Sequence, residues 1–520
     1  MKRLAVYPFL FALYIILVPL ADNLDQLDPS QVLRPLAFLL LVAAAGLLLF
    51  AALFKDWQYA AYLVFLVLAA FFVFGHINRL TMAILSTQNK DMAELVLLGI
   101  WLLLFVILGI KGIWSRLNGS TWMLPFFNLV FALALARPSY IVLTRLLLVP
   151  NQTRTASAQV LPPTGDASID CSSSPDIYYI VLDAYGRQDV LADLYNLDNR
   201  PFLDYLEGKG FYVASESHSN YMQTVFSIPA SLNYSYIDPP KKGVNGTEYF
   251  SNLLEYNRLM TVLEDCNYMT IAFESGFFFT AQPAVDLYFS DGNVLNNFEN
   301  LLLADSPWEV VGDQMNLDST EHSYNAHRQR VLYSFRQLEN LYKMPGPKMV
   351  FAHIISPHPP FIFDARGRSI TPARGYSLND GDEFRGTWEE YREGYAAQAE
   401  FINQKLEQAI DTILANSPTP PVIIIQGDHG PGGHLDWDSP TNSCLWERTS
   451  ILNAYYLPGD GESKLYPSIS PVNSFRVVLN TYFGANMVLL PDRTYFTSHR
   501  LKGKAIDITE ERSSRRRCTP

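Results

Sequence analysis

The chain has 520 residues, of which 49% are hydrophobic, and its formal net charge at pH 7 is −12. The first 150 residues carry 10 basic and 6 acidic residues, so the remaining 370 carry 29 and 45, a net charge of −16. The length allows several domains. Because nucleic-acid binding needs a basic surface, the acidic balance of the larger part excludes a nucleic-acid partner.

Long apolar runs in the first 150 residues predict a membrane domain. Each run is close to the roughly 17 to 25 residues that a bilayer-spanning helix needs. No clean cleavage site follows the first run, so we interpret it as an uncleaved anchor. We expect a bundle of five transmembrane helices over residues 1–150, with spans at Leu4 to Ala21, Pro35 to Phe54, Trp57 to Ile77, Leu95 to Ile110 and Asn118 to Ala136.

The charges between these runs predict the orientation of the chain. Lys2, Lys55 and Lys111 fall on one side of the five-span arrangement, and the acidic stretch Asp22 to Ser30 falls on the other. Basic residues favour the cytoplasmic side. An odd number of crossings then places everything after residue 150 outside the cytoplasm. We expect a multi-pass protein of the inner or plasma membrane with an extracytoplasmic C-terminal domain.

Two polar segments bound the expected globular domain, which spans residues 171–505. Residues 151–170 are small, polar and proline-containing, which predicts a linker. Residues 506–520 include the basic stretch Arg512 to Cys518. We expect a solvated tail there, with contact to anionic lipid head groups as the alternative.

All four cysteines, Cys171, Cys266, Cys444 and Cys518, lie in the part predicted to be outside the cytoplasm. An oxidising compartment allows one or two disulfides there. Four unrelated thiols are the alternative, since pairing depends on geometry that the sequence does not show. No Cys-x-x-Cys spacing indicates a metal or redox site.

Beyond the linker, short β-rich apolar runs alternate with segments of helical periodicity, which predicts a sheet covered by helices on both faces. The predicted strands are Asp176 to Ala184, Gly210 to Ser215, Tyr268 to Phe273, Lys348 to Ile355, Pro421 to Asp428 and Ile451 to Pro458. The clearest predicted helices are Arg200 to Gly210, Asn252 to Cys266 and Glu393 to Ser417.

Three of these strands end in side chains that can bind a metal or move a proton. Asp183 follows the first strand, His353 and His358 lie at the end of another, and Asp428 and His429 follow a third. Ligands gather at the carboxyl edges of such sheets. A carboxylate beside an imidazole suits zinc or manganese better than calcium, although a surface Asp-His pair is the alternative.

The stretch "TVFSIPAS" supplies three hydroxyls, those of Thr224, Ser227 and Ser231, near an expected helix start. A hydroxyl at that place lies at the positive end of the helix, and a nearby metal would lower its pKa so that it attacks as a nucleophile. Helix capping is the alternative role for any one of them.

The order of "YYIVLDAYG", "TVFSIPAS" and "IIIQGDHGPGG" resembles the alkaline phosphatase superfamily. The resemblance is to its sulfatase-like, membrane-anchored branch, which includes lipoteichoic acid synthases and phosphoglycerol and phosphoethanolamine transferases. It covers roughly Ser174 to Arg500 and the membrane part. It implies a mixed sheet between helices and an enzyme that transfers or hydrolyses phosphate-ester groups of a membrane lipid or a lipid-linked or glycan substrate.

The resemblance also implies a ligand set for one divalent metal ion, zinc or manganese. Asp183, Asp428 and His429 would bind the ion, and Thr224 would touch it while acting as the nucleophile. The T-x-x-S-x-P spacing is similar to that of phosphoethanolamine transferases, which favours Thr224 over Ser227.

Two further histidines receive roles from the same resemblance. His358, in "SPHPPF", would bind the substrate phosphate, and His434 would donate to the leaving oxygen, with a structural role as its alternative. His353 we expect to be a core residue.

A sulfatase and a non-catalytic envelope module are the alternative functions. True sulfatases carry a C/S-x-P-x-R motif, but here Ser231 stands where the arginine would be. Ala184 likewise stands where that branch has a second aspartate, which implies one metal ion instead of two. The segment Asp286 to Tyr342 holds no recognised motif. For its basic stretch Asn325 to Arg330 we expect a solvated helix face, with contact to an anionic group as the alternative.

Overall fold

The computed structural model describes residues 5–22, 32–84, 90–117, 123–148, 169–240, 246–282, 284–290, 297–304, 306–308, 310, 319–372, 376–498 and 505–518. The chain divides into two compact units. The first comprises Met1–Asn151 and Asn293–His322, and the second comprises Gln152–Gly292 and Ser323–Pro520.

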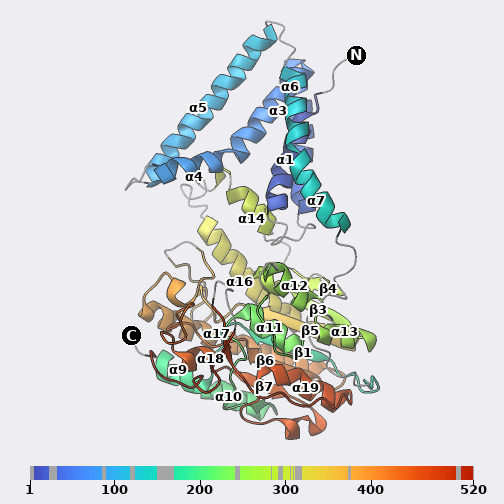
Figure 1. Cartoon of the computed structure of the whole chain (residues 1–520), viewed down its shortest axis with the longest axis vertical. Helices are drawn as coiled ribbons and strands as arrows, with labels where there is room; N and C mark the ends of the chain where they lie inside the picture. The colour runs from blue at the N-terminus through green and yellow to red at the C-terminus, as the bar shows by residue number, and fades with distance from the viewer. Residues whose placement is uncertain are drawn as a thin grey trace. The chain divides into compact units, whose positions relative to one another are not determined.

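The first unit is helical wherever it is described at length (Figure 1). Its apolar helices pack around small residues such as Ala12, Ala43 and Ala60, which are fully buried. Its helices are α1 (Tyr7–Asp22), α2 (Leu33–Phe54), α3 (Trp57–Phe72), α4 (Phe74–Ile84), α5 (Lys90–Leu117), α6 (Met123–Ala134), α7 (Ala136–Leu148) and α14 (Asn297–Ala304).

The prediction of five membrane spans is corrected to three candidate spans. In the described residues, the helices long and apolar enough to cross a membrane are Leu33–Phe54, Met92–Gly112 and Pro125–Thr144. The apolar helices α1 and α3 have 16 residues each. At 1.5 Å per residue they reach about 24 Å, which is short of the roughly 30 Å hydrocarbon core of a bilayer.

Helix α14 belongs to the first unit, although the sequence analysis places it inside the globular domain of residues 171–505. Phe298 and Leu302 are buried in the apolar cluster of the membrane helices. Glu299 accepts a hydrogen bond of 2.6 Å from the Arg34 Nε atom. An apolar face and a paired carboxylate therefore place this short helix with the N-terminal helices of the chain.

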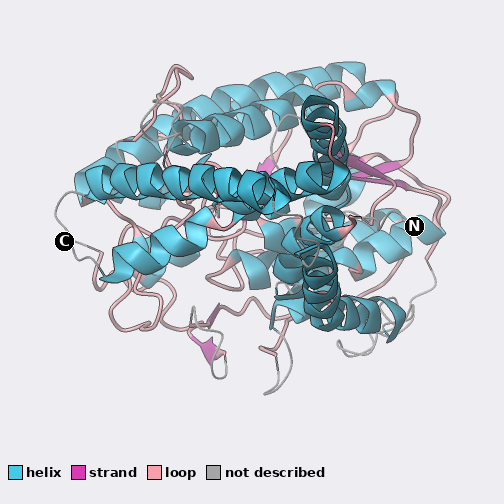
Figure 2. Cartoon of the chain, turned by 90° about the horizontal axis from the view of Figure 1, so that it is seen from above, coloured by secondary structure: helices cyan, strands magenta, loops and turns pink. Residues whose placement is uncertain are grey.

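The second unit contains a mixed seven-stranded sheet in the order β2-β7-β6-β1-β5-β3-β4, and the described strands all lie in this unit (Figure 2). The central strands run parallel, and β7 runs antiparallel to both of its neighbours. The strands of this sheet are β1 (Ile177–Leu182), β2 (Tyr212–Val213), β3 (Met269–Phe273), β4 (Leu287–Phe289), β5 (Lys348–Ile354), β6 (Val422–Gly427) and β7 (Asn453–Tyr456). A separate two-stranded sheet consists of β8 (Tyr495–Phe496) and β9 (Ile506–Asp507).

Helices cover both faces of the sheet, as the sequence predicts. Alternate residues of β1 point to opposite faces: Tyr178 and Ile180 join one core cluster, and Ile177 and Tyr179 join the other. The helices are α9 (Gln188–Tyr195), α10 (Arg200–Gly208), α11 (Thr224–Leu232), α12 (Gly246–Glu255), α13 (Arg258–Asp265), α16 (Ser319–Leu338), α17 (Trp388–Asn416), α18 (Leu445–Thr449) and α19 (Pro471–Tyr482), with short 3₁₀ turns at Phe278–Thr280, Leu341–Lys343, Gly381–Glu383 and Gly459–Lys464.

One predicted helix, Asn252 to Cys266, is two helices in the structure. Asn257 separates α12 from α13, because its side chain accepts a hydrogen bond from the Met260 backbone and caps the second helix. A capping residue can thus start a new helix while the helical spacing of the apolar residues continues, so the spacing alone does not show the break.

The expected solvated tail is instead part of the second unit. Strand β9 pairs with β8, and Cys518 forms a disulfide with Cys444, with the two Cα atoms 4.8 Å apart. Arg515 stacks on the Trp446 ring at 3.8 Å. A second disulfide joins Cys171 to Cys266. A disulfide, a strand pair and a cation–aromatic contact therefore hold residues 505–518 to the second unit, although Arg515, Arg516 and Arg517 stay exposed to solvent.

Candidate functional site

Two neighbouring parallel strands bring their carboxyl ends to the same edge of the sheet. Leu182, the last residue of β1, is level with Gly427, the last residue of β6. Asp183 and Asp428 follow these two positions directly, and His429 comes next. The in-register pairing therefore places two carboxylates and an imidazole side by side.

Asp183, Asp428 and His429 form a buried cluster in which one ligand atom of each lies within 4.8 Å of the others. The His429 Nε2 atom is 3.6 Å from Asp183 Oδ1 and 3.4 Å from Asp428 Oδ2. These two carboxylate oxygens are buried and have no hydrogen-bond partner in the described part of the chain. Buried anionic oxygens that face one another without donors fit a bound cation.

Backbone contacts hold the cluster in the form that a metal requires. The His429 Nδ1 atom is 3.0 Å from the Gly430 carbonyl, so Nδ1 carries the proton and Nε2 presents its lone pair to the carboxylates. The Ala184 backbone donates to Asp428 Oδ1 at 3.1 Å. Each ligand thus has one atom engaged by the protein and another directed at the centre.

Burial and neighbouring charges act on the protonation of these ligands. Burial alone would raise the pKa of Asp183, but the facing His358 and a hydrogen bond from His353 hold that pKa well below its ordinary value. Burial, reinforced by the Arg448 guanidinium, lowers the pKa of His429. An ionised aspartate and a neutral histidine are the forms that bind a divalent metal.

Thr224 is the hydroxyl residue that the structure brings to the cluster. It begins helix α11, and its Oγ1 atom lies 3.1 Å from His429 Nε2. The Ser227 hydroxyl instead donates to the Tyr221 carbonyl at 3.0 Å, and the Ser231 hydroxyl accepts from Tyr179 at 2.9 Å. Of the three hydroxyls in the predicted stretch, Thr224 therefore faces the metal ligands at the positive end of a helix.

The predicted substrate histidines occupy different places. The backbone N–H of His358 donates to the Asp183 carbonyl at 3.1 Å, and the centre of its ring is 6.3 Å from that of His429. The Nδ1 atom of His434 is 3.2 Å from Glu447 Oε2, and its ring packs on Trp388 with ring centres 4.2 Å apart. His358 thus lies beside the cluster, whereas His434 is held by Glu447 and makes no hydrogen bond to the cluster in the described residues.

His353, which we expected to be a core residue, is buried but also contacts a predicted ligand. Its Nε2 atom is 3.2 Å from Asp183 Oδ2, and its Nδ1 atom is 2.8 Å from the Thr280 hydroxyl. The side chain therefore orients the Asp183 carboxylate. Its place inside the apolar strand β5 hides this role in the sequence.

A buried ion pair between Arg448 and Asp380 is the main feature that the sequence reasoning missed. Arg448 Nη1 donates to Asp380 Oδ2 at 2.6 Å, and both side chains are almost fully buried. The same guanidinium donates to the Met222 and Gly430 carbonyls, and its Nη2 atom is 3.2 Å from His429 Nε2. The pair ties the loop after β6 to the segment that precedes Thr224.

The glycines after His429 permit close packing of neighbouring segments. Gly430 and Gly432 are not among the residues with positive φ. A Cβ atom on Gly430 would lie 2.1 Å from the Glu447 carbonyl, and one on Gly432 would lie 2.4 Å from the Asp380 carboxylate. The Glu447 backbone and the Asp380 side chain can therefore approach the loop after β6 only because Gly430 and Gly432 have no side chains.

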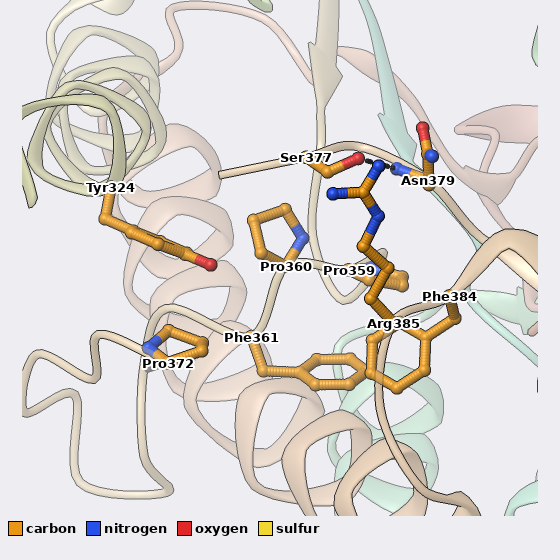
Figure 3. A pocket seen from close by; sticks show the side chains of 9 residues that line it. All are labelled: Tyr324, Pro359, Pro360, Phe361, Pro372, Ser377, Asn379, Phe384 and Arg385. Carbon is orange, nitrogen blue, oxygen red and sulfur yellow. Dashed lines mark hydrogen bonds between the residues drawn. The ribbon is translucent and has the colours of Figure 1, made fainter. Parts of the chain in front are cut away.

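A small cavity with a volume of about 30 Å³ adjoins the site (Figure 3). Proline and phenylalanine rings line it, with Ser377, Asn379 and Arg385 on one side. Pro359 in its wall follows His358, and Asn379 precedes Asp380, whose carboxylate is 3.9 Å from His358 Nε2. The cavity has room for a few atoms of a ligand, and its wall includes residues adjacent in sequence to His358 and Asp380.

Comparison with known proteins assigns the fold that carries this site. Residues 175–467, more than half of the chain, match the family model described as Sulfatase. The chain belongs to the sulfatase family. This family lies within the alkaline phosphatase superfamily that the sequence motifs indicate. No curated protein matches this sulfatase-family chain significantly.

Several solved structures are similar to this sulfatase-family chain. The C-terminal periplasmic domain of EcEptC from Escherichia coli, in complex with Zn, is 13% identical, with a TM-score of 0.43 and coverage of 67% of this chain and 96% of that one. The periplasmic domain of the phosphoethanolamine transferase EptC from Campylobacter jejuni is 13% identical, with a TM-score of 0.38 and coverage of 61% and 92%. A putative sulfatase from Bacteroides thetaiotaomicron is 12% identical, with a TM-score of 0.38 and coverage of 66% and 87%.

Removing either carboxylate of the cluster should abolish metal binding by this sulfatase-family chain. We expect about one divalent ion per purified chain, and close to none in Asp183→Asn or Asp428→Asn, because each change replaces an anionic ligand by a neutral amide of the same shape. Elemental analysis by mass spectrometry measures the content. Asp438→Asn, at an exposed position of the same loop, should keep the full amount, and metal retained in both ligand variants would disprove the assignment.

Breaking the buried ion pair should destabilise the second unit strongly. Arg448→Met leaves Asp380 buried without its cation, at an expected cost of about 3–5 kcal/mol. Thermal denaturation of the full chain in detergent would show a lower Tm. The double variant Arg448→Met with Asp380→Asn should recover part of the loss, whereas Arg200→Met, which breaks the exposed pair with Asp198, should cost less than about 1 kcal/mol.

Proposed function

We propose that this chain is a membrane-anchored, metal-dependent enzyme that transfers or hydrolyses a phosphate-ester group through a phosphothreonine at Thr224. One observation carries the proposal: the Thr224 hydroxyl lies 3.1 Å from a predicted metal ligand, His429, beside oxygens of Asp183 and Asp428 that have no hydrogen-bond partner in the described residues. A nucleophile, a cation site and a helix N-terminus at one point suit attack on an anionic ester.

Asp183, Asp428 and His429 would hold one zinc or manganese ion, which would lower the pKa of the Thr224 hydroxyl and offset the negative charge of the ester. Two carboxylates and one imidazole match the donors that these metals prefer. Ala184 occupies the place of a further acid, so the ligand set supports a single ion.

The reaction has two displacements at phosphorus. In the first, Thr224 Oγ1 gives its proton to solvent and bonds to phosphorus while the bond from phosphorus to the leaving alcohol oxygen breaks. That oxygen takes up a proton, for which His434 is the proposed donor. In the second, water or an acceptor hydroxyl attacks phosphorus, the bond to Oγ1 breaks, and Thr224 is restored.

His358 is proposed to bind the non-bridging oxygens of the reacting group. It lies beside Asp183 through its backbone hydrogen bond, and its Nε2 atom faces the Asp380 carboxylate across 3.9 Å. An imidazole held there can donate to an anionic oxygen, and its position facing Asp183 also helps to lower the pKa of that carboxyl.

Sulfate-ester hydrolysis is the second candidate, because the matching family model is that of the sulfatases. It would require Ser227 to be converted into an aldehyde that faces the metal. The Ser227 hydroxyl is instead bonded to the Tyr221 carbonyl, and Ser231 replaces the arginine of the sulfatase motif. Both features favour Thr224 and a phosphate ester.

The proposed substrate is a phospholipid or a lipid-linked or glycan phosphate ester, met at the outer face of an inner or plasma membrane. Three candidate spans, like five, carry the chain across an odd number of times. Two disulfides in the second unit fit an oxidising compartment. Membrane helices and an extracytoplasmic site together support a substrate that resides in or on the bilayer.

Thr224→Ala should abolish turnover of phosphate esters, because it removes the nucleophile while the three other ligands remain. Turnover of aryl phosphates and aryl sulfates by the full chain, together with metal content, measures this. We expect a loss of more than about 100-fold for the phosphate ester with metal still bound. Ser227→Ala should keep phosphate turnover, and the opposite pattern on the sulfate ester would establish the sulfatase mechanism instead.

The location can be tested through the exposed Cys171. Intact cells treated with a mild reductant should become reactive toward a membrane-impermeant maleimide, because reduction frees Cys171 from its disulfide with Cys266. A variant that lacks both cysteines should lose this signal. Reaction that occurs only after the cells are lysed would place the second unit in the cytoplasm.

A further inference from the structure

Arg330 is a cation beside the site that has no carboxylate partner among the residues that the structure describes. It lies on α16, in the basic stretch for which the sequence suggested a solvated helix face. The structure buries its neighbours His327 and Arg328 almost fully and leaves Arg330 partly buried. No ion pair joins Arg330 to an acid in the part of the chain described, and its Nε atom is buried without a hydrogen-bond partner.

The backbone around Arg330 is shaped to accept its guanidinium. Gly276, at a φ of +84°, packs so closely that a Cβ atom there would lie 1.9 Å from Arg330 Nη1 and 3.1 Å from Nε. A residue with a side chain could not hold this conformation without strain, nor leave the guanidinium its place. The loop after β3 thus packs directly against the guanidinium that helix α16 carries.

The groups that face Arg330 do not neutralise it. Tyr376 contacts it through the phenol, and burial raises the pKa of that phenol. Burial, reinforced by Arg330 itself, lowers the pKa of His327 to about 3, so this histidine is neutral. A half-buried arginine among neutral groups keeps its positive charge and its planar set of donors for a ligand.

Two contacts connect the surroundings of Arg330 to the segments that carry the predicted metal ligands. The His327 Nε2 atom, one helical turn before Arg330, is 2.9 Å from the Ile355 carbonyl, just past the end of β5. In the loop that contains Gly276, the Thr280 hydroxyl contacts His353, which contacts Asp183. Arg330 therefore lies near the site but separate from the cluster itself.

From this arrangement we propose that Arg330 binds an anionic group of the substrate, a phosphate or a carboxylate, other than the group that reacts at Thr224. A guanidinium recognises such oxyanions through two parallel hydrogen bonds. The substrate class that follows is an ester with two anionic groups. The assignment of the ligand to a substrate rests on the proposed function, whereas the anion site itself does not.

The first test measures the binding of inorganic phosphate to the full chain in detergent, with divalent metal removed by a chelator. We expect wild type to bind phosphate and Arg330→Gln to bind it at least about tenfold more weakly, because a charge-assisted pair of hydrogen bonds is lost. Arg336→Gln, which removes the same charge from an exposed position on the same helix, should bind like wild type. Isothermal titration calorimetry gives the Kd values.

Gly276→Ala supplies a variant that retains the arginine. Its methyl group would occupy the place of the guanidinium, so we expect the same loss of phosphate affinity with the charge unchanged. Phosphate affinity that is the same in wild type and Arg330→Gln would overturn the proposal, as would the absence of phosphate binding by wild type.

A kinetic test separates the two anionic groups. Arg330→Gln should raise KM about tenfold for an aryl phosphate that carries an additional carboxylate, and leave KM for the plain aryl phosphate and both kcat values unchanged. An equal rise in KM for both esters would mean that Arg330 binds the reacting group, contrary to the proposal. If neither ester is turned over, the proposed function fails, and the phosphate-binding measurement still decides whether the anion site exists.

Discussion

The in-register pairing of β1 with β6 is the constraint on which the rest of the site depends. It delivers two aspartates to adjacent positions at one edge of a buried sheet, together with a histidine. Like charges brought together away from water repel strongly unless a cation lies between them. The nearby donors hold the outer atoms of these side chains, and the inner oxygens have no hydrogen-bond partner among the described residues. The strand register therefore brings two carboxylates close together, and a divalent ion between them would offset their repulsion.

A second interaction keeps this arrangement rigid. The Arg448 guanidinium reaches the loop after β6, the carboxylate of Asp380 and the carbonyl of Met222, two residues before Thr224. Tyr391 donates to the other oxygen of Asp380 and accepts from the Gly432 backbone. These bonds link the segment that precedes Thr224 to the loop that carries His429, although 205 residues separate these two positions. The distance between Thr224 and His429 is thus set by a buried charge network and by the glycines that admit it.

Local patterns were sufficient to predict six of the nine described strands and the residues at their ends. Asp183, Asp428 and His429 each follow a run of apolar residues long enough to form a buried strand, so their place at the sheet edge follows from the pattern. The residues alone left Thr224, Ser227 and Ser231 as alternatives near an expected helix start, and only the resemblance to phosphoethanolamine transferases favoured Thr224. The six predicted strands all occur in the structure, with the ends shifted by a few residues.

Features that depend on contacts distant in sequence were not predictable in the same way. Arg448 and Asp380 carry no local signal, because each is one charged residue in a short segment without a motif until the fold buries them together. His353 looks like any residue of an apolar strand, and its contact with Asp183 arises from the pairing of β5 with β1. The tail residues are basic, yet Cys518 anchors them to Cys444. The count of spans failed because apolar composition does not by itself show where a helix ends.

The placement of α14 bears on how the soluble part of this chain can be produced. A fragment that starts after the membrane helices would still contain Phe298 and Leu302, whose burial depends on helices that the fragment lacks. Glu299 would likewise be cut off from Arg34. An expressed fragment therefore needs polar replacements in this insertion to stay monodisperse. It must also extend to residue 518, since an earlier stop would leave an orphan thiol at the base of α18.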